Sequence, residues 1–231
     1  RVVSIGNVKI GGENPIAIQS MCNTKTEDVA ATVAQIHRLE KAGCQIIRCT
    51  VPTHEAALAI REIKKQISIP LVADIHFDYR MAIEAMENGA DKIRINPGNI
   101  GGAENVKAVA EACRKRSIPI RIGVNAGSLE PRLIEKYGHP CPEAMVESAQ
   151  GHVELLQRFD FDDICLSMQA SSVPLTVAAY RLAAERFDHT LHLGVTEMGT
   201  AWKGNIQFAV GRCPPQCEGI SSTNTVPLQA D

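Results

Sequence analysis

The sequence predicts a parallel β/α barrel of the TIM type, (β/α)8, in a single domain over residues 1–231. Short runs of β-branched and apolar residues alternate with segments of helical period, which is typical of a parallel α/β sheet. Seven or eight such units in 231 residues favour one closed barrel over an open doubly wound sheet. No G-x-G-x-x-G pattern follows the first strand, which disfavours a dinucleotide-binding sheet.

Eight segments are expected to form the barrel strands, and most are continuous apolar runs typical of parallel strands covered on both faces. They span residues 16–20, 45–49, 69–75, 91–95, 118–124, 163–168, 191–195 and, more weakly, 223–228. Ahead of them, residues 2–12 alternate around Gly6 and Asn7 and predict a short β-hairpin.

The first helix is expected where an apolar stripe runs from Val29 to Leu39. Thr24 and Glu27 have the spacing of a capping box ahead of it, and Gly43 is a helix stop.

Two segments depart from the repeating pattern. Residues 125–142 form the longest gap, and a long loop after a barrel strand lies on the functional face, where it is a candidate lid. Residues 212–231 are atypical, because Pro227 is awkward in a barrel strand and no eighth helix follows. We therefore expect a barrel incomplete at its C-terminal end, in a piece of a longer protein.

Composition excludes several classes of partner. The formal net charge is -2 and aromatic residues make up 4%, which disfavours a nucleic-acid surface. No run of 18 apolar residues predicts a membrane span, and no signal peptide is recognisable, so a cytoplasmic protein is expected.

The eight cysteines do not have the spacing of a disulfide scaffold. Four lie in apolar strand or helix patterns and are expected to be buried, reduced thiols: Cys44, Cys49, Cys113 and Cys165. Cys213 and Cys217 form a C-x-x-x-C pair, which supplies two of the four ligands of a structural zinc, so no metal site is predicted.

Arginine occurs in the middle of three predicted strands, at Arg48, Arg94 and Arg121, with apolar residues on both sides. Since successive side chains of a strand face opposite ways, outward apolar neighbours place these arginines inside the barrel, where an unpaired charge is costly. Internal pairing with Asp74 and Glu197 is one explanation, but two acids do not balance three arginines. Phosphate binding is the favoured alternative, because the guanidinium fork matches phosphate oxygens.

Polar residues at the ends of the same strands are further candidates. Asn96 and Asn125 begin glycine-rich stretches whose backbone N–H groups suit anions, although ordinary turn chemistry favours the same residues. Asp74 and His76 follow the third strand, and Ser20 ends the first.

Glu197 ends the seventh strand and suits a general acid or base, or equally a helix cap or an arginine partner.

Long motifs along the chain resemble one family. GGENPIAIQSM, GCQIIRCTVP, LVADIHFDYRMA, GADKIRINPGNIG, IPIRIGVNAGSLE, DDICLSMQASSV and LHLGVTEMGT are similar to the 4-hydroxy-3-methylbut-2-enyl diphosphate synthases of the methylerythritol phosphate route to isoprenoids. The resemblance runs from the N-terminus to about Val210 and implies a barrel that holds 2-C-methyl-D-erythritol 2,4-cyclodiphosphate.

The resemblance also implies residue roles. The residues that would hold the diphosphate are Arg48, Arg94, Asn96, Arg121 and Asn125. Glu197 would be the catalytic acid or base. Gln169 stands where the family has a lysine that contacts the diphosphate, so weaker substrate binding is expected.

The family further implies a [4Fe-4S] cluster on a C-terminal domain, with ligands outside this chain, a homodimer in the bacterial cytoplasm, and ferredoxin or flavodoxin as electron donor. This chain by itself is expected to be inactive. Two alternatives stay open: another phosphate-handling barrel, such as an aldolase or a pteroate-synthase-like enzyme, and a non-catalytic remnant. Lys92 lies too early in its strand for the Schiff base of an aldolase.

Overall fold

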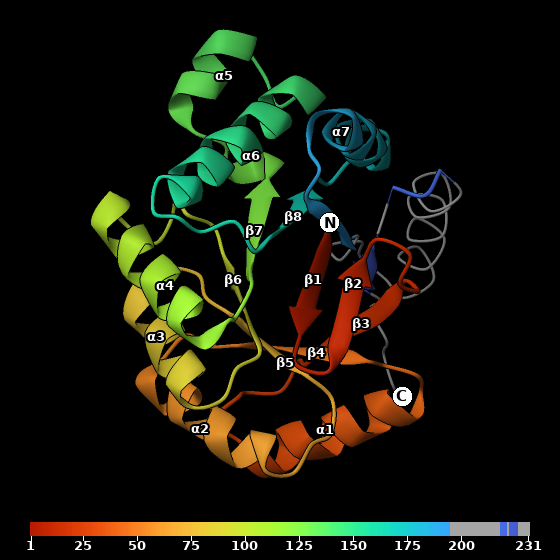
Figure 1. Cartoon of the computed structure of the whole chain (residues 1–231), viewed down its shortest axis with the longest axis vertical. Coiled ribbons are helices and arrows are strands. Elements are labelled where there is room, and N and C mark those ends of the chain that lie inside the picture. The colour runs from red at the N-terminus through yellow and green to blue at the C-terminus, as the bar shows by residue number, and fades with distance from the viewer. Residues whose placement is uncertain (195–217, 221, 226–231) are drawn as a thin grey trace.

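The computed structural model describes residues 1–194, 218–220 and 222–225, and its eight parallel strands close into a barrel (Figure 1). The strands are β3 (Ala17–Met21), β4 (Ile46–Thr50), β5 (Leu71–Asp74), β6 (Lys92–Ile95), β7 (Ile120–Asn125), β8 (Ile164–Gln169), β9 (Thr190–Gly194) and β10 (Thr223–Thr225). Each overlaps a predicted strand, so the predicted fold class is confirmed.

The weakest predicted strand, β10, completes the ring. It pairs in parallel with both β9 and β3, so the sheet is a closed barrel. Pro227 lies outside the described residues.

Helices surround the strands (Figure 1). They are α1 (Val29–Lys41), α2 (His54–Lys64), α3 (Tyr79–Glu87), α4 (Ala103–Arg116), α5 (Pro131–Tyr137), α6 (Pro142–Gln157) and α7 (Val173–Arg186). The predicted long loop of residues 125–142 is not one irregular lid, because it contains the 3-10 turn η1 (Ala126–Ser128) and α5. Lys136 and Tyr137 at the end of α5 both donate to Glu147 of α6, which ties this segment to the barrel wall.

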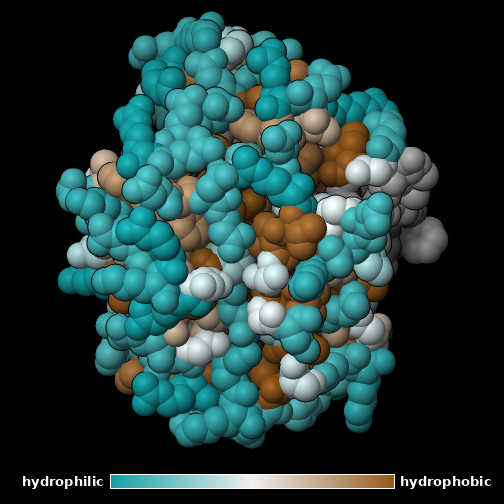
Figure 2. Space-filling model, in the orientation of Figure 1, coloured by the Kyte–Doolittle hydropathy of each residue, from teal (hydrophilic) through white to brown (hydrophobic). Residues whose placement is uncertain are grey.

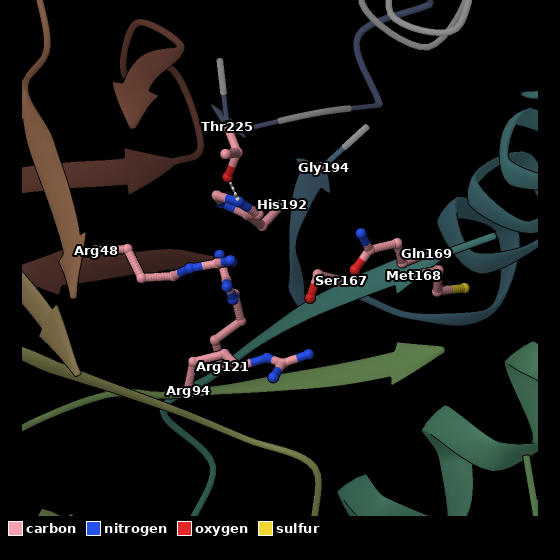
Figure 3. Close-up of a pocket in the computed structure, with 9 residues that line it drawn as sticks. All are labelled: Arg48, Arg94, Arg121, Ser167, Met168, Gln169, His192, Gly194 and Thr225. Atoms are coloured by element: carbon pink, nitrogen blue, oxygen red, sulfur yellow. Dashed lines mark hydrogen bonds between the residues drawn. The ribbon is translucent and has the colours of Figure 1, made fainter. Parts of the chain in front are cut away.

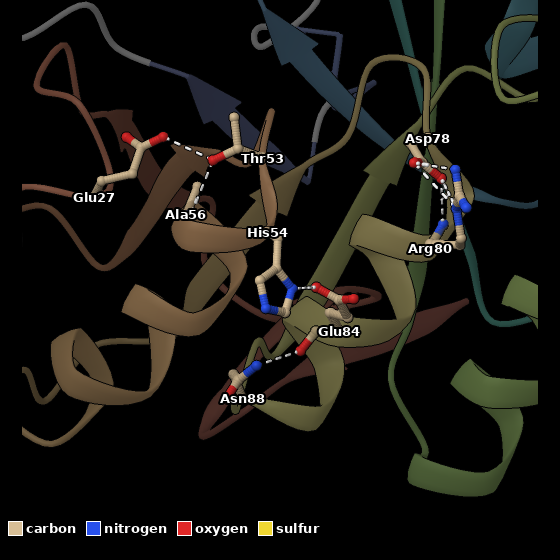
Figure 4. Close-up of polar contacts among 8 residues, drawn as sticks. All are labelled: Glu27, Thr53, His54, Ala56, Asp78, Arg80, Glu84 and Asn88. Atoms are coloured by element: carbon tan, nitrogen blue, oxygen red, sulfur yellow. Dashed lines mark hydrogen bonds and ion pairs between the residues drawn. The ribbon is translucent and has the colours of Figure 1, made fainter.

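Side-chain caps fix the starts of the first three helices. The predicted capping box of Thr24 and Glu27 is wrong, because the N-cap of α1 is Asp28, four residues after Thr24, and its side chain accepts the N–H of Ala31 at 3.0 Å. Glu27 instead accepts a hydrogen bond from Thr53, the N-cap of α2 (Figure 4).

The same close-up shows how α2 and α3 are joined. Asp78 caps α3 and also pairs with Arg80, while His54 of α2 lies 2.6 Å from Glu84 of α3 (Figure 4). These contacts are at the surface and orient the helices rather than supply much stability.

The N-terminal hairpin closes the bottom of the barrel. Strands β1 (Val2–Ile5) and β2 (Val8–Gly11) pair antiparallel, as predicted. The hairpin residues Val3, Ile5 and Ile10 pack in one buried cluster with barrel residues that include Ile46 and Val72. The N-terminal end of the lumen is therefore filled with apolar side chains, and the opposite end is left for a site.

The main core lies between the strands and the helices. The isoleucines that flank the arginines are buried there, including Ile47, Ile93 and Ile122, as the alternation predicted. The four cysteines expected to be buried free thiols are both buried and free, which confirms that prediction. Cys213 and Cys217 lie outside the described residues.

The visible surface is mainly hydrophilic, with hydrophobic residues in separate patches (Figure 2). Within the described part of the chain, no helix has the length and apolar character needed to cross a membrane.

Candidate functional site

Three arginines enter the lumen from three strands, as predicted: Arg48 from β4, Arg94 from β6 and Arg121 from β7 (Figure 3). They line a narrow cavity of about 20 Å³. The rest of its lining comes from Ser167, Met168, Gln169, His192, Gly194 and Thr225. Towards the C-terminal ends of the strands, Arg48, Arg94 and Gln169 also line a wider cavity of about 260 Å³. The lumen is thus a funnel whose wide end has room for a small ligand.

Asp74 neutralises part of the arginine charge. Its carboxylate lies 3.0 Å from Nη1 of Arg94 and 3.4 Å from Nε of Arg48. Burial opposes ionisation, but the two guanidiniums outweigh it and hold the pKa of Asp74 below its usual range. Internal pairing therefore explains one carboxylate and two of the arginines.

Arg121 is not paired in this way. Its side chain is 2% exposed, and neither Nε nor Nη1 has a hydrogen-bond partner among the described residues. Burial, together with the charges of Arg48 and Arg94, lowers its pKa to about 9. A buried guanidinium without an acceptor is costly unless a ligand supplies the acceptor.

Lys92 adds a fourth buried cation below the arginines. Its register partner Val72 packs in the inner cluster, whereas its neighbour Ile93 packs under the helices, so Lys92 faces the lumen. Its Nζ has no hydrogen-bond partner in the described ranges, and burial lowers its pKa to about 8. Among the described residues that line the two cavities, Asp74 is the single carboxylate, against the three arginines.

His192 is a site residue that the sequence prediction missed. It is fully buried on β9, with Nδ1 and Nε2 each 2.6 Å from a hydroxyl oxygen, of Thr223 and Thr225 respectively. Burial and the nearby cations, Arg121 foremost, hold its pKa well below the usual range, so the ring is neutral at physiological pH. Its flanking residues Leu191 and Leu193 repeat the pattern that revealed the arginines, and this signal was available in the sequence.

Asn96 and Asn125 lie at the wide end of the funnel, where both line the larger cavity. The side-chain oxygen of Asn96 accepts the N–H of Gly98 at 3.0 Å, and that of Asn125 accepts the N–H of Gly127 at 2.9 Å. The turn explanation is therefore confirmed for both asparagines, and their place in the cavity wall leaves anion binding a prediction.

The remaining predicted residues divide into two groups. His76 lies at the mouth, 3.7 Å from Asp74, and Gln169 ends β8 within the cavity wall. Ser20 pairs with the outward-facing Ile47 and so lies on the helix side of β3, not in the lumen. Glu197 lies outside the described residues.

The neighbours of Ser20 face the lumen in its place. Met21 accepts a hydrogen bond from Nε of Arg48 at 3.0 Å, and Gln19 donates to Thr225 at 3.4 Å.

The described residues do not fit an iron–sulfur cluster. Among them, no group of three or more His, Cys, Asp or Glu side chains could hold a metal. Burial raises the pKa of the Cys44 thiol to about 11 and that of Cys165 above its usual value, so both stay protonated.

Comparison with known protein families identifies the family of this chain. A family model described as the GcpE TIM-barrel domain matches residues 1–231. The chain belongs to the GcpE TIM-barrel domain family. Curated relatives include proteins of Anoxybacillus flavithermus and Geobacillus thermodenitrificans, each 58% identical to this chain over 231 residues. The match covers 64% of the first protein and 62% of the second. A Fusobacterium nucleatum relative is 56% identical over 228 residues, which is 99% of this chain and 64% of the relative.

All three relatives bear the name 4-hydroxy-3-methylbut-2-en-1-yl diphosphate synthase (flavodoxin). The first two matches cover 100% of this chain. This member of the GcpE family therefore spans a little under two thirds of the length of these relatives.

Two solved structures share the fold at low sequence identity. Dihydropteroate synthase from Yersinia pestis superposes with a TM-score of 0.69 at 12% identity, covering 97% of this chain and 91% of that one. A truncated 3-deoxy-D-arabino-heptulosonate 7-phosphate synthase from Thermotoga maritima gives 0.69 at 13% identity, with 99% and 80% covered. At these identities the likeness is one of fold alone.

Proposed function

We propose that this chain supplies the barrel that binds 2-C-methyl-D-erythritol 2,4-cyclodiphosphate for its reductive conversion to 4-hydroxy-3-methylbut-2-enyl diphosphate. The observation that carries the proposal is the surplus of buried positive charge in the funnel, where Arg121 lacks an acceptor among the described residues. A cyclic diphosphate brings two anionic groups on a compact ring. The names of the relatives support the same substrate class.

The described residues would act by binding and orientation. Arg48, Arg94 and Arg121 offer charge-assisted hydrogen bonds to the phosphoryl oxygens, which are stronger than neutral ones. Asn96 and Asn125 would contact the ring side of the diphosphate from the mouth. Neutral His192, held by the hydroxyls of Thr223 and Thr225, would line the narrow cavity without adding to its charge.

Catalysis needs groups beyond these residues. The resemblance assigns Glu197 the role of acid or base. An iron–sulfur cluster would supply electrons, and we propose that its ligands lie outside the described residues, since none of these fits it. Flavodoxin is the electron donor that the relatives' names favour over ferredoxin. A homodimer in the bacterial cytoplasm remains part of this proposal.

A pteroate-synthase-like activity is the second candidate, because solved dihydropteroate synthases share the fold. Their likeness extends to the fold alone, and nothing in the funnel favours a pterin over a diphosphate. Lys92 does not line either cavity of the funnel, so a Schiff-base aldolase is not favoured.

The proposal is tested by thermal unfolding of the chain with and without the cyclodiphosphate. A ligand at 100 times its Kd stabilises a fold by ~2.7 kcal/mol, which raises the Tm measurably. Arg94→Ala should abolish the rise, whereas Arg114→Ala, which removes a half-exposed arginine of α4, should preserve it.

A folded wild-type chain whose Tm does not respond to the cyclodiphosphate contradicts the proposal and favours a non-catalytic remnant. The chain by itself should show no reductive turnover.

A further inference from the structure

Gly123 of β7 lies against the guanidinium of Arg94. A Cβ placed on Gly123 would be 2.7 Å from both Nε and Nη2 of Arg94 and 3.0 Å from its Cζ. These distances are shorter than carbon–nitrogen contacts in folded proteins, so the guanidinium occupies the space that any other residue at position 123 would need.

The backbone at this position does not itself require glycine. Gly123 lies inside strand β7 and is not one of the glycines with positive φ, such as Gly11 or Gly138. Alanine would fit the backbone of an inner strand position. The missing side chain therefore serves Arg94 rather than a turn or bulge.

The register explains why Arg94 needs this space. Arg94 pairs with Arg121 across β6 and β7, and like charges directly opposite each other are destabilising. Gly123 follows Arg121 by two residues, which is about 6–7 Å nearer the mouth of the barrel. The Arg94 guanidinium lies over Gly123 and is therefore nearer the mouth of the barrel than the backbone of Arg121. Its Nη1 remains 3.0 Å from the carboxylate of Asp74.

The linings of the two cavities differ in the same way. Arg94 lines both the narrow and the wide part of the funnel, whereas Arg121 lines only the narrow part. The atoms without a hydrogen-bond partner among the described residues also differ: they are Nε and Nη1 of Arg121, and Nε of Arg94. The funnel thus offers cationic donors at two depths.

We propose that Gly123 is a specificity determinant of the site: it seats Arg94 above Arg121, so that the two guanidiniums meet the two phosphoryl groups of one diphosphate. This rests on the proposed function and extends it. Gly123 acts through Arg94, so it is a positioning residue and does not itself contact the ligand.

The test is a binding cycle by calorimetry with pyrophosphate and with inorganic phosphate. Wild type should prefer pyrophosphate, and Gly123→Ala should lower the affinity for pyrophosphate at least tenfold while that for phosphate changes little. In an Arg94→Ala background the glycine substitution should have no further effect. Gly151→Ala, in the middle of α6, is the matched control and should bind pyrophosphate as wild type does.

A Gly123→Ala chain that binds pyrophosphate as wild type does overturns the proposal, and so does an effect that adds in full to that of Arg94→Ala. Absence of any preference for pyrophosphate in wild type overturns the specificity role. Pyrophosphate binding without cyclodiphosphate binding would sink the proposed substrate and leave the role of Gly123 intact.

A second readout needs no ligand. Because Arg94 helps to hold the pKa of Asp74 low, displacing it should raise that pKa. Carbon-13 NMR titration of Asp74 should show the rise in Gly123→Ala, in the direction of Arg94→Ala, and none in Gly151→Ala. An unchanged Asp74 in a folded Gly123→Ala chain overturns the positioning role.

Discussion

At the scale of single residues, the proposed binding role of Arg121 implies a cost in stability. It is buried beside two other arginines, and two of its nitrogen atoms have no acceptor among the described residues. Replacing a buried charge by an apolar side chain of similar length is often stabilising, and active sites commonly trade stability for function.

Arg121→Met is therefore expected to raise the free energy of unfolding by ~1–4 kcal/mol, because it removes an uncompensated buried cation. It should also weaken cyclodiphosphate binding by roughly 10- to 100-fold, since a hydrogen bond to a charged group contributes ~1.5–3 kcal/mol. Urea unfolding and calorimetry measure the two effects. Arg114→Met on α4 is the control and should change neither property appreciably. A less stable Arg121→Met chain would contradict the account of Arg121.

His192 predicts a pH dependence of stability. Its pKa in the folded chain lies well below the usual ~6.5 that it regains on unfolding. Its contribution is therefore complete above about pH 6.5 and is lost as the pH falls towards the folded-state pKa, at up to ~1.4 kcal/mol per pH unit. His152, whose pKa burial also lowers, adds to the same window.

His192→Gln should reduce the slope of unfolding free energy against pH between about pH 6.5 and 5 by up to ~1.4 kcal/mol per pH unit. The reason is that the unfolded chain then has one fewer group to protonate. Urea unfolding at a series of pH values measures the slope. An unaltered slope in a folded His192→Gln chain would show that this histidine is protonated in the native state.

Gln169 ends β8 in the wall of both cavities. Restoring the lysine that the family resemblance expects should tighten cyclodiphosphate binding about tenfold, since it adds a charge-assisted contact. Calorimetry on Gln169→Lys measures this, with Gln150→Lys on the exposed surface of α6 as the control for net charge. Equal or weaker binding by Gln169→Lys would argue that Gln169 does not face the diphosphate.

Residue alternation predicted the interior arginines because each is flanked by residues that can only face the helices. It missed His192 because histidine was assessed by its chemistry and not by its apolar neighbours Leu191 and Leu193. It misplaced Ser20 because a strand end has no strong pattern, and an error of one residue exchanges the two faces of a strand. The seating of Arg94 on Gly123 depends on side-chain conformation, which no sequence pattern contains.

At the scale of elements, the hairpin of β1 and β2 acts as a plug for the barrel. Ile5 and Ile10 are fully buried against inward-facing residues of the strands, whereas Val2 of the same hairpin is 52% exposed. The apolar floor that they form separates the cationic lumen from solvent at the N-terminal end.

Ile5→Ala should lower the free energy of unfolding by ~2–5 kcal/mol, since it leaves a cavity in a packed cluster. Val2→Ala, on the exposed face of the same strand, should change it by less than ~0.5 kcal/mol. Urea unfolding separates the two. Similar small losses in both variants would mean that the hairpin does not pack on the barrel.

Strand positions were predictable because β-branched apolar runs in a parallel sheet are distinctive. The start of α1 was not, because Thr24 and Asp28 both suit an N-cap, and the contact of Glu27 with Thr53 takes Glu27 out of the capping box expected with Thr24. The short helix α5 was likewise hidden in a segment rich in glycine and proline.

At the scale of the whole molecule, the fold concentrates charge at one end of a closed barrel. The hairpin fills the bottom, three arginines and Asp74 line the cavities of the funnel, and the funnel widens to about 260 Å³ at the top. The barrel is closed by β10, whose three residues pair with both β9 and β3. Sequence patterns predicted this strand only weakly, because its three residues are all polar: Thr223 and Thr225 contact His192 in the lumen, and Asn224 lies on the outer face beside Leu193.

The most direct test of the central claim is a crystal structure of this chain with the cyclodiphosphate. The proposed binding mode predicts density for the ligand inside the funnel, with its two phosphoryl groups within hydrogen-bond distance of Arg94 and Arg121. Density at another place on the molecule, or an empty funnel at ligand concentrations that saturate binding in solution, would contradict it.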